Sequence, residues 1–349
     1  MTRYATPSIR GPAGDAAMLR FVVRKLLLAA STLLAVSVLT FGLFFVLPSN
    51  PAELMCGESK TVCGPERIAM IESRMGLDRP IPHQYADFMR GLFAGRTIGT
   101  GLTARDCPAP CLGYSFRTDE PVTDIVARTL PVTVSIVAGG AVFWLLAGVA
   151  VGALAALRRG TLVDRLAVGA SLVGAAMPML LLGPLLLLGL VYQTGLLSYP
   201  RYTPLTEDPL AWASALILPW LALGLVNAAT YARLTRAQLL ETLGEDFVRT
   251  ARAKGLPRRA VHGRHALRAA ITPVLTMAGL DVGAHLGGVV VTETVFGFTG
   301  LGRTALTAAV NLDMPIVLAT VLLGAVFVVT ANLLVDVGYA VIDPRIRLG

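Results

Sequence analysis

Six apolar runs, each long enough to cross a lipid bilayer, constrain this chain more than any other feature. They cover residues of about 26–47, 130–157, 166–192, 211–232, 269–292 and 314–341. About 20 helical residues span the hydrocarbon core, and in lipid every backbone N–H and C=O must be hydrogen-bonded within the protein. We therefore predict an all-α integral membrane protein with six transmembrane helices. The composition agrees, because 54% of residues are hydrophobic and only 15% are charged.

Basic residues indicate which side of the membrane each connecting segment faces. The segments 1–25, 158–165, 233–268 and 342–349 hold 5, 3, 9 and 2 of the 30 Lys and Arg residues, whereas 193–210 and 293–313 hold one each. Lys and Arg accumulate in cytoplasmic loops, so both termini are expected to be cytoplasmic. The first run is interpreted as a spanning helix because no small-residue cleavage site of a signal peptide follows it.

The expected organisation follows from these spans. It comprises a cytoplasmic tail (1–25), a first span (26–47), an extracytoplasmic segment (48–129), a five-helix core (130–341) that includes a cytoplasmic loop (233–268), and a cytoplasmic C-terminus (342–349). Within 48–129, the stretch 67–95 predicts two amphipathic helices separated by a turn at Pro80 and Pro82.

All four cysteines of the chain lie in the extracytoplasmic segment, at Cys56, Cys63, Cys107 and Cys111. An even number of cysteines outside the cytoplasm favours disulfides. A zinc site fits poorly, because the cysteine spacings come without a nearby pair of histidines. Four cysteines allow three pairings, of which the local pairs Cys56–Cys63 and Cys107–Cys111 are the simplest.

The segment 233–268 is too polar for lipid, and its pattern predicts helix, stop, helix. Glu245 and Asp246 suit the positive N-terminal end of a short helix. The apolar side of that helix would carry Phe247, Val248 and Ala251. Gly255 can end it in the left-handed conformation, and Pro257 can begin the next helix because a first-turn N–H is unbonded anyway. The result would be a stiff elbow held out from the membrane. Positive-inside bias explains the charge of this segment, but not its paired short helices.

Asp281 and His285 are ionisable residues at membrane depth, where a charge costs on the order of 3 kcal/mol. Asp281 lies roughly 18 Å along a helix from Ala269 at ~1.5 Å per residue, near the middle of the bilayer. His285 follows four residues later on the same face, so the two side chains can pair. Two interpretations stay open: contact with a transported solute, or a mutually satisfied pair packed between helices.

Other polar residues and prolines of the spans have structural explanations. Interhelical hydrogen bonding is expected of Asn227 and Tyr231 on the fourth run and of Asn332 and Asp336 on the sixth. Glu293 is expected near the outer interface, where a charge costs little. Breaks are expected at Pro178 and Pro184 in the third run and at Pro219 in the fourth.

Motifs of common enzyme classes are absent. The three lysines, Lys25, Lys60 and Lys254, lie outside any phosphate-binding loop, so the chain is not expected to hydrolyse ATP. HExxH and GxSxG are also missing, and no metal site is expected. An intramembrane aspartyl protease using Asp281 and Asp336 is disfavoured because their depths differ. Nucleic-acid binding is disfavoured because the basic residues flank apolar spans.

Several short motifs carry a resemblance to a known family. They are MGLDRPI (75–81), GYSFRT (113–118), RTARAKGL (249–256), RHALR (264–268) followed by Pro273, ETVFG (293–297), GLGR (300–303) and DPRIR (343–347). Their order and spacing resemble the B-type permease subunit of ATP-binding-cassette importers of the dipeptide, oligopeptide and nickel class, from about residue 20 to the end. RTARAKGL resembles the EAA loop, of which only Ala251 and Gly255 match the general pattern. Residues 97–111 and 56–63 look like insertions.

The resemblance implies a multi-pass inner-membrane permease that moves peptides or a related small solute and is not itself an enzyme. Its implied partners are a second homologous permease, two ATPases that hold ATP and Mg, and an extracytoplasmic solute-binding protein. The elbow 245–268 would seat in a cleft of the ATPase as a pair of coupling helices and move the fourth and fifth spans. The small Ala251 and Gly255 would allow close approach.

The candidate site residues fall into three groups. Coupling to the ATPase is expected of Arg249, Ala251, Arg252, Lys254, Gly255, Leu256 and Pro257. The candidate translocation path comprises Asp281, His285, Asn227 and Glu293. The outer mouth would carry Phe298, Gly300, Gly302 and Arg303.

Two other functions account for fewer of these sequence features. An ion- or proton-coupled secondary transporter would use Asp281 and His285, although the internal repeats typical of such proteins are not apparent. A membrane enzyme or sensor built on 48–129 lacks a catalytic motif. The solute itself stays open among dipeptides, oligopeptides, nickel chelates, haem-like ligands and glutathione.

Overall fold

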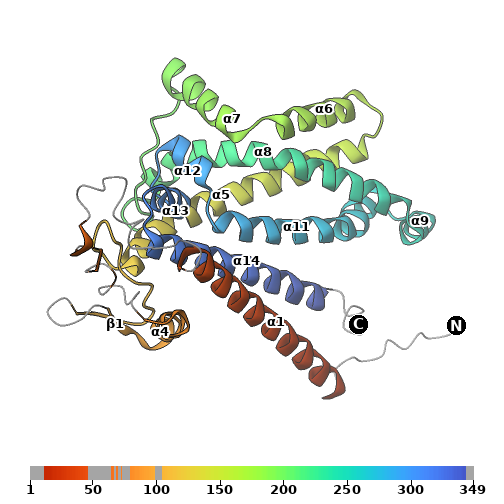
Figure 1. The fold of residues 1–349 in the computed structure, drawn as a ribbon. Helices are drawn as coiled ribbons and strands as arrows, with labels where there is room; N and C mark the ends of the chain where they lie inside the picture. The colour runs from red at the N-terminus through yellow and green to blue at the C-terminus, as the bar shows by residue number, and fades with distance from the viewer. Residues whose placement is uncertain are drawn as a thin grey trace.

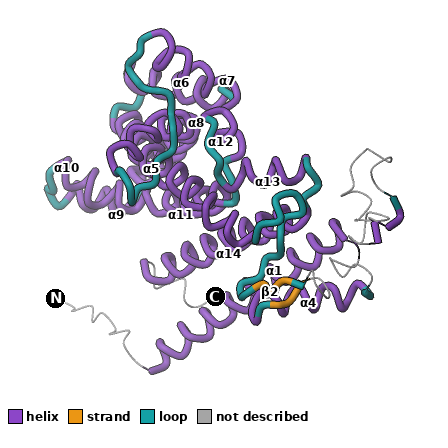
Figure 2. The backbone as a smooth tube through the Cα atoms, turned by 90° about the vertical axis from the view of Figure 1, so that its left-hand side faces the viewer, coloured by secondary structure: helices purple, strands orange, loops and turns teal. Residues whose placement is uncertain are grey.

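The computed structural model describes residues 12–45, 64–66, 68–69, 72, 79–98 and 104–342 of the chain. Long helices run side by side and form most of the molecule (Figures 1 and 2). The helices are α1 (Pro12–Phe45), α4 (Ile81–Ala94), α5 (Val122–Leu157), α6 (Leu162–Ala176), α7 (Met179–Leu186), α8 (Pro209–Gly244), α9 (Asp246–Ala253), α10 (Arg258–Ala260), α11 (Arg268–Leu286), α12 (Val290–Phe296), α13 (Leu301–Val310) and α14 (Met314–Ile342). There are two π-helical stretches. η2 (Leu187–Gln193) continues α7, and η3 (Val261–Leu267) lies between α10 and α11.

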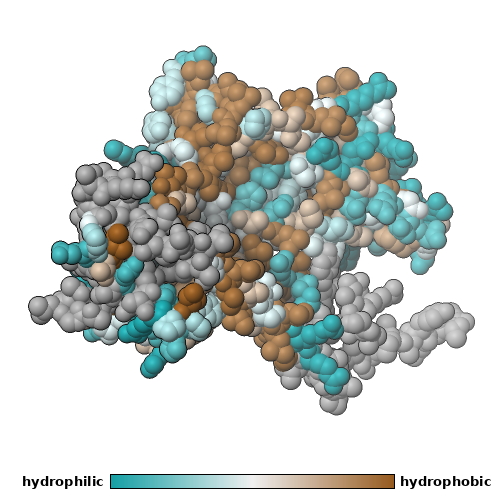
Figure 3. Space-filling model, viewed as in Figure 1, coloured by the Kyte–Doolittle hydropathy of each residue, from teal (hydrophilic) through white to brown (hydrophobic). Residues whose placement is uncertain are grey.

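The two ends of the bundle carry different elements (Figure 1). The α9 end holds α9, the start of α1 and the end of α14. The α13 end holds α4, α12, α13 and a hairpin of two short antiparallel strands, β1 (Arg96–Ile98) and β2 (Arg105–Cys107). Figure 3 shows a largely hydrophobic surface between the two ends and hydrophilic residues over the α9 end.

Five described helices are long and apolar enough to cross a membrane alone. They lie in the ranges Val23–Leu43, Val122–Leu157, Pro209–Gly244, Arg258–Leu286 and Met314–Asp336. A sixth crossing is formed if the pair Leu162–Ala176 and Met179–Gln193, bent by 103°, is one span. The helices therefore fit an all-α membrane protein with five or six spans.

Three predicted spans differ in detail from the structure. The third breaks only at Pro178, before α7, whereas Pro184 and Pro219 lie inside continuous helices. The fourth extends past residue 232, because α8 runs on to Gly244. The fifth ends early: α11 stops at Leu286, and Gly288, with a φ of 136°, turns the chain into α12.

The central contact of the bundle joins α5 to α8, and glycines on α5 make it close. Gly148 lies against the Tyr231 side chain and the backbone of Ala228, and Gly152 against the carbonyl of Ala232. A Cβ at either glycine would overlap these atoms. Apolar side chains gain little from association inside lipid, so close backbone approach at small residues is what holds such helices together.

At the α13 end, α4 packs on α1. The ring of Phe41 meets that of Tyr85 at 5.4 Å between centroids, and the Tyr85 hydroxyl lies 2.7 Å from Oγ of Ser37. The prediction of a helix after Pro80 is confirmed. The predicted helix before Pro80 lies mostly outside the described residues.

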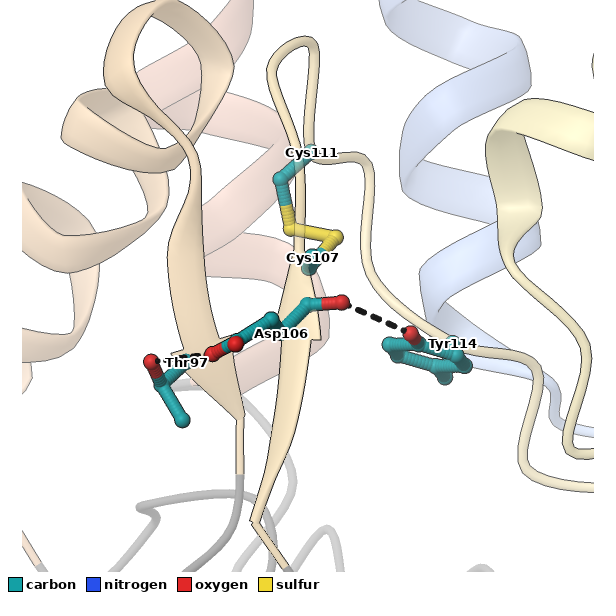
Figure 4. Close-up of a disulfide and its surroundings, with 5 residues drawn as sticks. All are labelled: Thr97, Asp106, Cys107, Cys111 and Tyr114. Atoms are coloured by element: carbon teal, nitrogen blue, oxygen red, sulfur yellow. Dashed lines mark hydrogen bonds between the residues drawn. A yellow bond between two sulfur atoms is a disulfide. The ribbon is translucent and has the colours of Figure 1, made fainter.

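Beside α4, the hairpin β1–β2 is joined to the next loop by a disulfide between Cys107 and Cys111 (Figure 4). The backbone carbonyl of Asp106 accepts a hydrogen bond from the Tyr114 hydroxyl, and its carboxylate accepts one from Thr97. Cys56 and Cys63 lie outside the described residues.

Candidate functional site

A compact elbow connects α8 to α11 at the α9 end. α9 begins after Glu245 and ends at Ala253. Gly255 then has a φ of 77°, a left-handed conformation that a side chain would strain, and Pro257 precedes α10. The predicted helix, stop, helix pattern is confirmed, with one difference. The second helix is not separate, because α10 continues through η3 into α11.

The inner side of the elbow is apolar and buried. Val248 (0% exposed) and Ala251 (7%) pack with small and aliphatic side chains of α5, α8, η3 and α11. The expectation that Ala251 allows close approach of a partner is therefore wrong, since its methyl group faces the core of this chain. Phe247 also differs from expectation: it is 46% exposed, whereas the adjacent Val248 is fully buried.

The outer side of the elbow is basic with two apolar side chains. Phe247 and Leu256 are 46% and 40% exposed. The other exposed residues between 245 and 259 are Glu245, Asp246, Arg249, Thr250, Arg252, Ala253, Lys254, Gly255, Pro257, Arg258 and Arg259, of which five are basic and two acidic. Aromatic residues and Arg are enriched in protein interfaces, and such anchors bind in grooves of a partner. The outer side therefore has the composition of a protein-binding surface.

Below the elbow, an ion pair joins α6 to α8. Arg236 donates from Nε to Oδ1 of Asp164 at 2.6 Å and from Nη2 to Oδ2 at 2.9 Å. The backbone N–H of Gly160 donates to Oδ2 at 2.9 Å. The Asp164 side chain is 7% exposed and that of Arg236 28%. This two-pronged geometry fixes the direction as well as the distance between the two helices.

A polar cluster lies deeper in the bundle, where α5, α8 and α11 meet. The Tyr231 hydroxyl of α8 donates to Oδ2 of Asp281 on α11 at 2.6 Å. The ring of Trp144, on α5, lies 5.3 Å from that of His285 and 6.3 Å from that of Tyr231. Trp144 is fully buried, and its Nε1 has no hydrogen-bond partner among the described residues.

The predicted pairing of the Asp281 and His285 side chains is wrong. Nδ1 of His285 instead lies 2.7 Å from the backbone carbonyl of Asp281, one helical turn back. The side chain of Asp281 points across to α8, where the buried Tyr231 offers a donor that needs an acceptor. Oδ1 of Asp281 accepts no hydrogen bond from any described residue.

The predicted interhelical hydrogen bonds form at Tyr231 and at Asp336, but not at Asn227. Nζ of Lys25 on α1 donates to Oδ2 of Asp336 on α14 at 2.7 Å. The Asn227 amide bonds back to the carbonyl of Leu223 in its own helix. Asn332 is exposed.

Glu293, expected near the outer interface, lies on α12 at the α13 end and is 0% exposed, so its carboxylate is held by the protein and not by water. Thr133 of α5 donates to Oε1 at 2.6 Å, and the backbone N–H of Arg303 donates to Oε2 at 2.7 Å. Oγ1 of Thr133 also accepts from the N–H of Leu301 at 2.7 Å. The carboxylate and the hydroxyl thus satisfy first-turn N–H groups of α13, where a helix favours negative charge. Burial raises the pKa of Glu293, and these hydrogen bonds oppose the rise.

The residues expected at the outer mouth lie around the hydrogen-bond network of Glu293. Phe298 is buried, and Gly300 lies so close to the Glu293 carboxylate that a Cβ would overlap it. Gly302 packs against the backbone of Gly288 and Val290. Arg303 is half-buried.

A second acid that the sequence analysis did not single out anchors the α13 end. Asp313 is 2% exposed and accepts hydrogen bonds from the Ser115 hydroxyl at 2.5 Å and from the Phe116 N–H at 3.2 Å. It joins the GYSFRT stretch to the start of α14. The described residues contain no group of three or more His, Cys, Asp and Glu side chains suited to a metal ion.

Comparison with known families decides which class of protein this architecture serves. The family described as "Binding-protein-dependent transport system inner membrane component" matches residues 148–348, and its N-terminal companion matches residues 18–137. The chain belongs to this family of transport permeases. It is thus a multi-pass inner-membrane transport component, with the elbow, the ion pair and both carboxylate networks inside the matched regions.

Similar permeases span nearly the whole chain. The dipeptide transport system permease protein DppB of Escherichia coli K12 is 36% identical over 353 residues, covering 95% of this chain and 99% of that protein. The di/tripeptide transport system permease protein DppB of Pseudomonas aeruginosa is 37% identical over 352 residues, with the same coverage. A probable peptide ABC transporter permease of Sinorhizobium fredii is 34% identical over 331 residues, covering 94% and 99%.

Several permease residues of this site were missed by sequence reasoning. Thr133, Trp144 and Asp164 lie on elements far from their partners in the chain, so no local spacing marks them. The motifs that contain Ser115 and Gly300 did signal importance, but only the fold shows that each of these residues lies against a buried carboxylate.

Proposed function

We propose that this permease is the pore-forming subunit of an ATP-driven importer of dipeptides or oligopeptides. The observation that carries the proposal is the near full-length similarity to permeases named for dipeptide and di/tripeptide transport. The exposed basic elbow supports it. A permease without a phosphate-binding loop cannot hydrolyse ATP itself, so it needs a surface on which a separate ATPase can bind and transmit its conformational change. ATP and Mg would be held by that partner.

The proposed topology places the α9 end in the cytoplasm and the α13 end outside. The basic residues of the elbow and the apolar belt between the two ends support this orientation. Residues 1–25 and 342–349 would then be cytoplasmic, and 48–129 would lie outside, where an oxidising environment favours the Cys107–Cys111 disulfide.

The proposed assembly contains a second homologous permease, two ATPases and an external solute-binding protein. The ATPases would receive Phe247 and Leu256 in apolar grooves, with Arg249, Arg252 and Lys254 facing acids around them. Gly255 and Pro257 would set the angle of the elbow. The binding protein would dock at the α13 end, which Glu293 and Asp313 hold in one arrangement.

The proposed translocation path passes Asp281. Trp144, in contact with the same cluster, lies at the middle of the apolar run 130–157, so Asp281 is at a similar depth. A half-buried carboxylate at that depth is too costly to face lipid. We propose that the free Oδ1 faces the interior between the two permeases, where it contacts the passing peptide, with His285 and Asn227 beside it. The closed hydrogen-bond network of Glu293 supports a framing role for that residue instead.

Reconstitution tests the proposed function. The transporter, purified with its partner subunits, is placed in proteoliposomes with a labelled dipeptide and the binding protein outside. Uptake is expected to require ATP on the elbow side and to continue with an uncoupler present. Uptake that collapses with the uncoupler and ignores ATP would instead support secondary transport through Asp281 and His285.

A further inference from the structure

The ion pair between Asp164 and Arg236 lies on the route between the elbow and the other end of the molecule. Arg236 is eight residues before Gly244, the last residue of α8, which is about 12 Å at ~1.5 Å per residue. Only Glu245 separates α9 from α8, and α8 is continuous from Gly244 to Arg236, so a displacement of α9 that moves the end of α8 also moves Arg236. Asp164 lies in the first turn of α6, directly after the connection from α5.

α6 is attached to the bundle along one face only. Leu162, Leu166, Leu172 and Val173 are 69%, 63%, 55% and 62% exposed. On the attached face, Gly174 lies against the Ala229 methyl group of α8. Among the described residues, side-chain hydrogen bonds join α6 to α8 only at Asp164 and Arg236. Apolar contacts allow sliding, whereas a two-pronged charged pair resists both sliding and rotation.

Beyond α6, the chain continues into α7, which contacts the helices at the α13 end. α6 and α7 are bent by 103° at Met177 and Pro178. Gly183 of α7 lies against the side chains of Val295 and Phe296 of α12. α12 also carries Glu293, whose carboxylate caps α13. Contacts therefore run without interruption from the elbow through α8, α6 and α7 to the helices at the α13 end.

We propose that Asp164 and Arg236 are positioning residues for energy coupling. Their ion pair locks the first turn of α6 to α8, so that force received by α9 moves the bent α6–α7 unit and, through it, α12. This inference rests on the proposed ATP-driven import. It differs from a general stabilising role, because it predicts that breaking the pair separates ATP hydrolysis from transport.

The test measures peptide uptake and ATP hydrolysis in the same proteoliposomes, with the transporter purified together with its partner subunits. Arg236→Lys keeps the positive charge but cannot donate the two parallel hydrogen bonds of the guanidinium group. Asp164→Asn keeps the shape of the side chain but removes its negative charge. Arg233→Lys and Glu241→Gln are matched controls, because both residues are exposed on α8. In the first two variants, the peptide imported per ATP is expected to fall by roughly 5-fold or more, the lower end of typical coupling between sites. Both controls should match the wild type.

The charge-swapped double variant, Asp164→Arg with Arg236→Asp, covers the case in which a single variant fails to assemble. Recovery of both assembly and peptide per ATP supports the proposal. If assembly recovers but the peptide imported per ATP does not, or if neither recovers, the ion pair serves folding alone and the proposal is overturned. An unchanged ratio in both assembled single variants overturns it as well. Wild-type uptake that needs no ATP would overturn the proposed function instead, and so is distinguishable.

Discussion

The Tyr231 hydroxyl lies 2.6 Å from Oδ2 of Asp281, and this hydrogen bond ties together α8 and α11, the two helices that the elbow connects. One carboxylate oxygen is therefore held by the protein, while Oδ1 accepts no hydrogen bond from the described residues. A carboxylate fixed in this way is oriented before a solute arrives, which reduces the entropy lost on binding.

Asp281→Asn is expected to lower the kcat/KM of dipeptide uptake while leaving assembly and basal ATP hydrolysis intact. A hydrogen bond to a charged group is worth about 1.5–3 kcal/mol, or roughly 10- to 150-fold. Peptides with a free N-terminal ammonium should lose more than their N-acetylated forms. Tyr231→Phe, which removes only the orienting donor, should have a smaller effect. Equal uptake by wild type and Asp281→Asn would exclude Asp281 from the path.

Gly255→Pro should abolish coupling through the elbow. Proline fixes φ near −65°, whereas Gly255 has a φ of 77°, so the angle between α9 and α10 must change. The transporter should still assemble, but ATP-driven uptake should be lost. Gly263→Ala is the control, because Gly263 is helical and has no atom within 4 Å of the added Cβ. Uptake at the wild-type rate in Gly255→Pro would remove the elbow from the mechanism.

Phe247→Ala and Val248→Ala should affect different properties although the residues are adjacent. Phe247 is 46% exposed, so its loss should weaken binding of the ATPase by at least about 1 kcal/mol and leave stability nearly unchanged. Val248 is fully buried, so its truncation should cost on the order of 1–2 kcal/mol of stability. Pull-down of the ATPase and thermal unfolding in detergent distinguish the two. A Phe247 variant that binds the ATPase normally would show that the outer side of the elbow is not the contact.

Glu293→Gln should destabilise the α13 end by about 1–3 kcal/mol, because an amide N–H₂ replaces an acceptor in a buried network. It would face either the N–H of Arg303 or the Thr133 hydroxyl, whose O–H would then lose its acceptor. Thermal unfolding of the purified complex measures the loss. Glu207→Gln, on the exposed connection before α8, is the control and should unfold at the wild-type temperature. A wild-type unfolding temperature for Glu293→Gln would show that the carboxylate does not hold α13.

Much of the fold could be predicted from the sequence because the signals are local. The ends of α9 follow from Glu245, Asp246 and Gly255, which act through hydrogen bonds and φ values within a few residues. The apolar runs predicted the spans for the same reason, and Pro178 predicted a break, although the size of the bend, 103°, and the end of α11 at Leu286 were not predicted.

The site was predicted less well where it depends on partners distant in the chain. Spacing placed Asp281 and His285 on one helical face, but could not reveal that Tyr231 of another helix competes for the carboxylate. Glu293 was placed at an interface because its position between spans is visible in the sequence, whereas Thr133 and the first turn of α13 are brought to it only by the fold.

The sequence by itself determined a multi-pass helical membrane protein with a rigid basic elbow, because hydrophobic length and backbone propensity are properties of contiguous residues. Only the tertiary structure decided which charges are held: Asp164 by Arg236, Asp313 by Ser115, and Glu293 by Thr133 and α13. A buried charge must find its hydrogen bonds wherever the packed helices supply them, and that choice of neighbour is made by the whole fold.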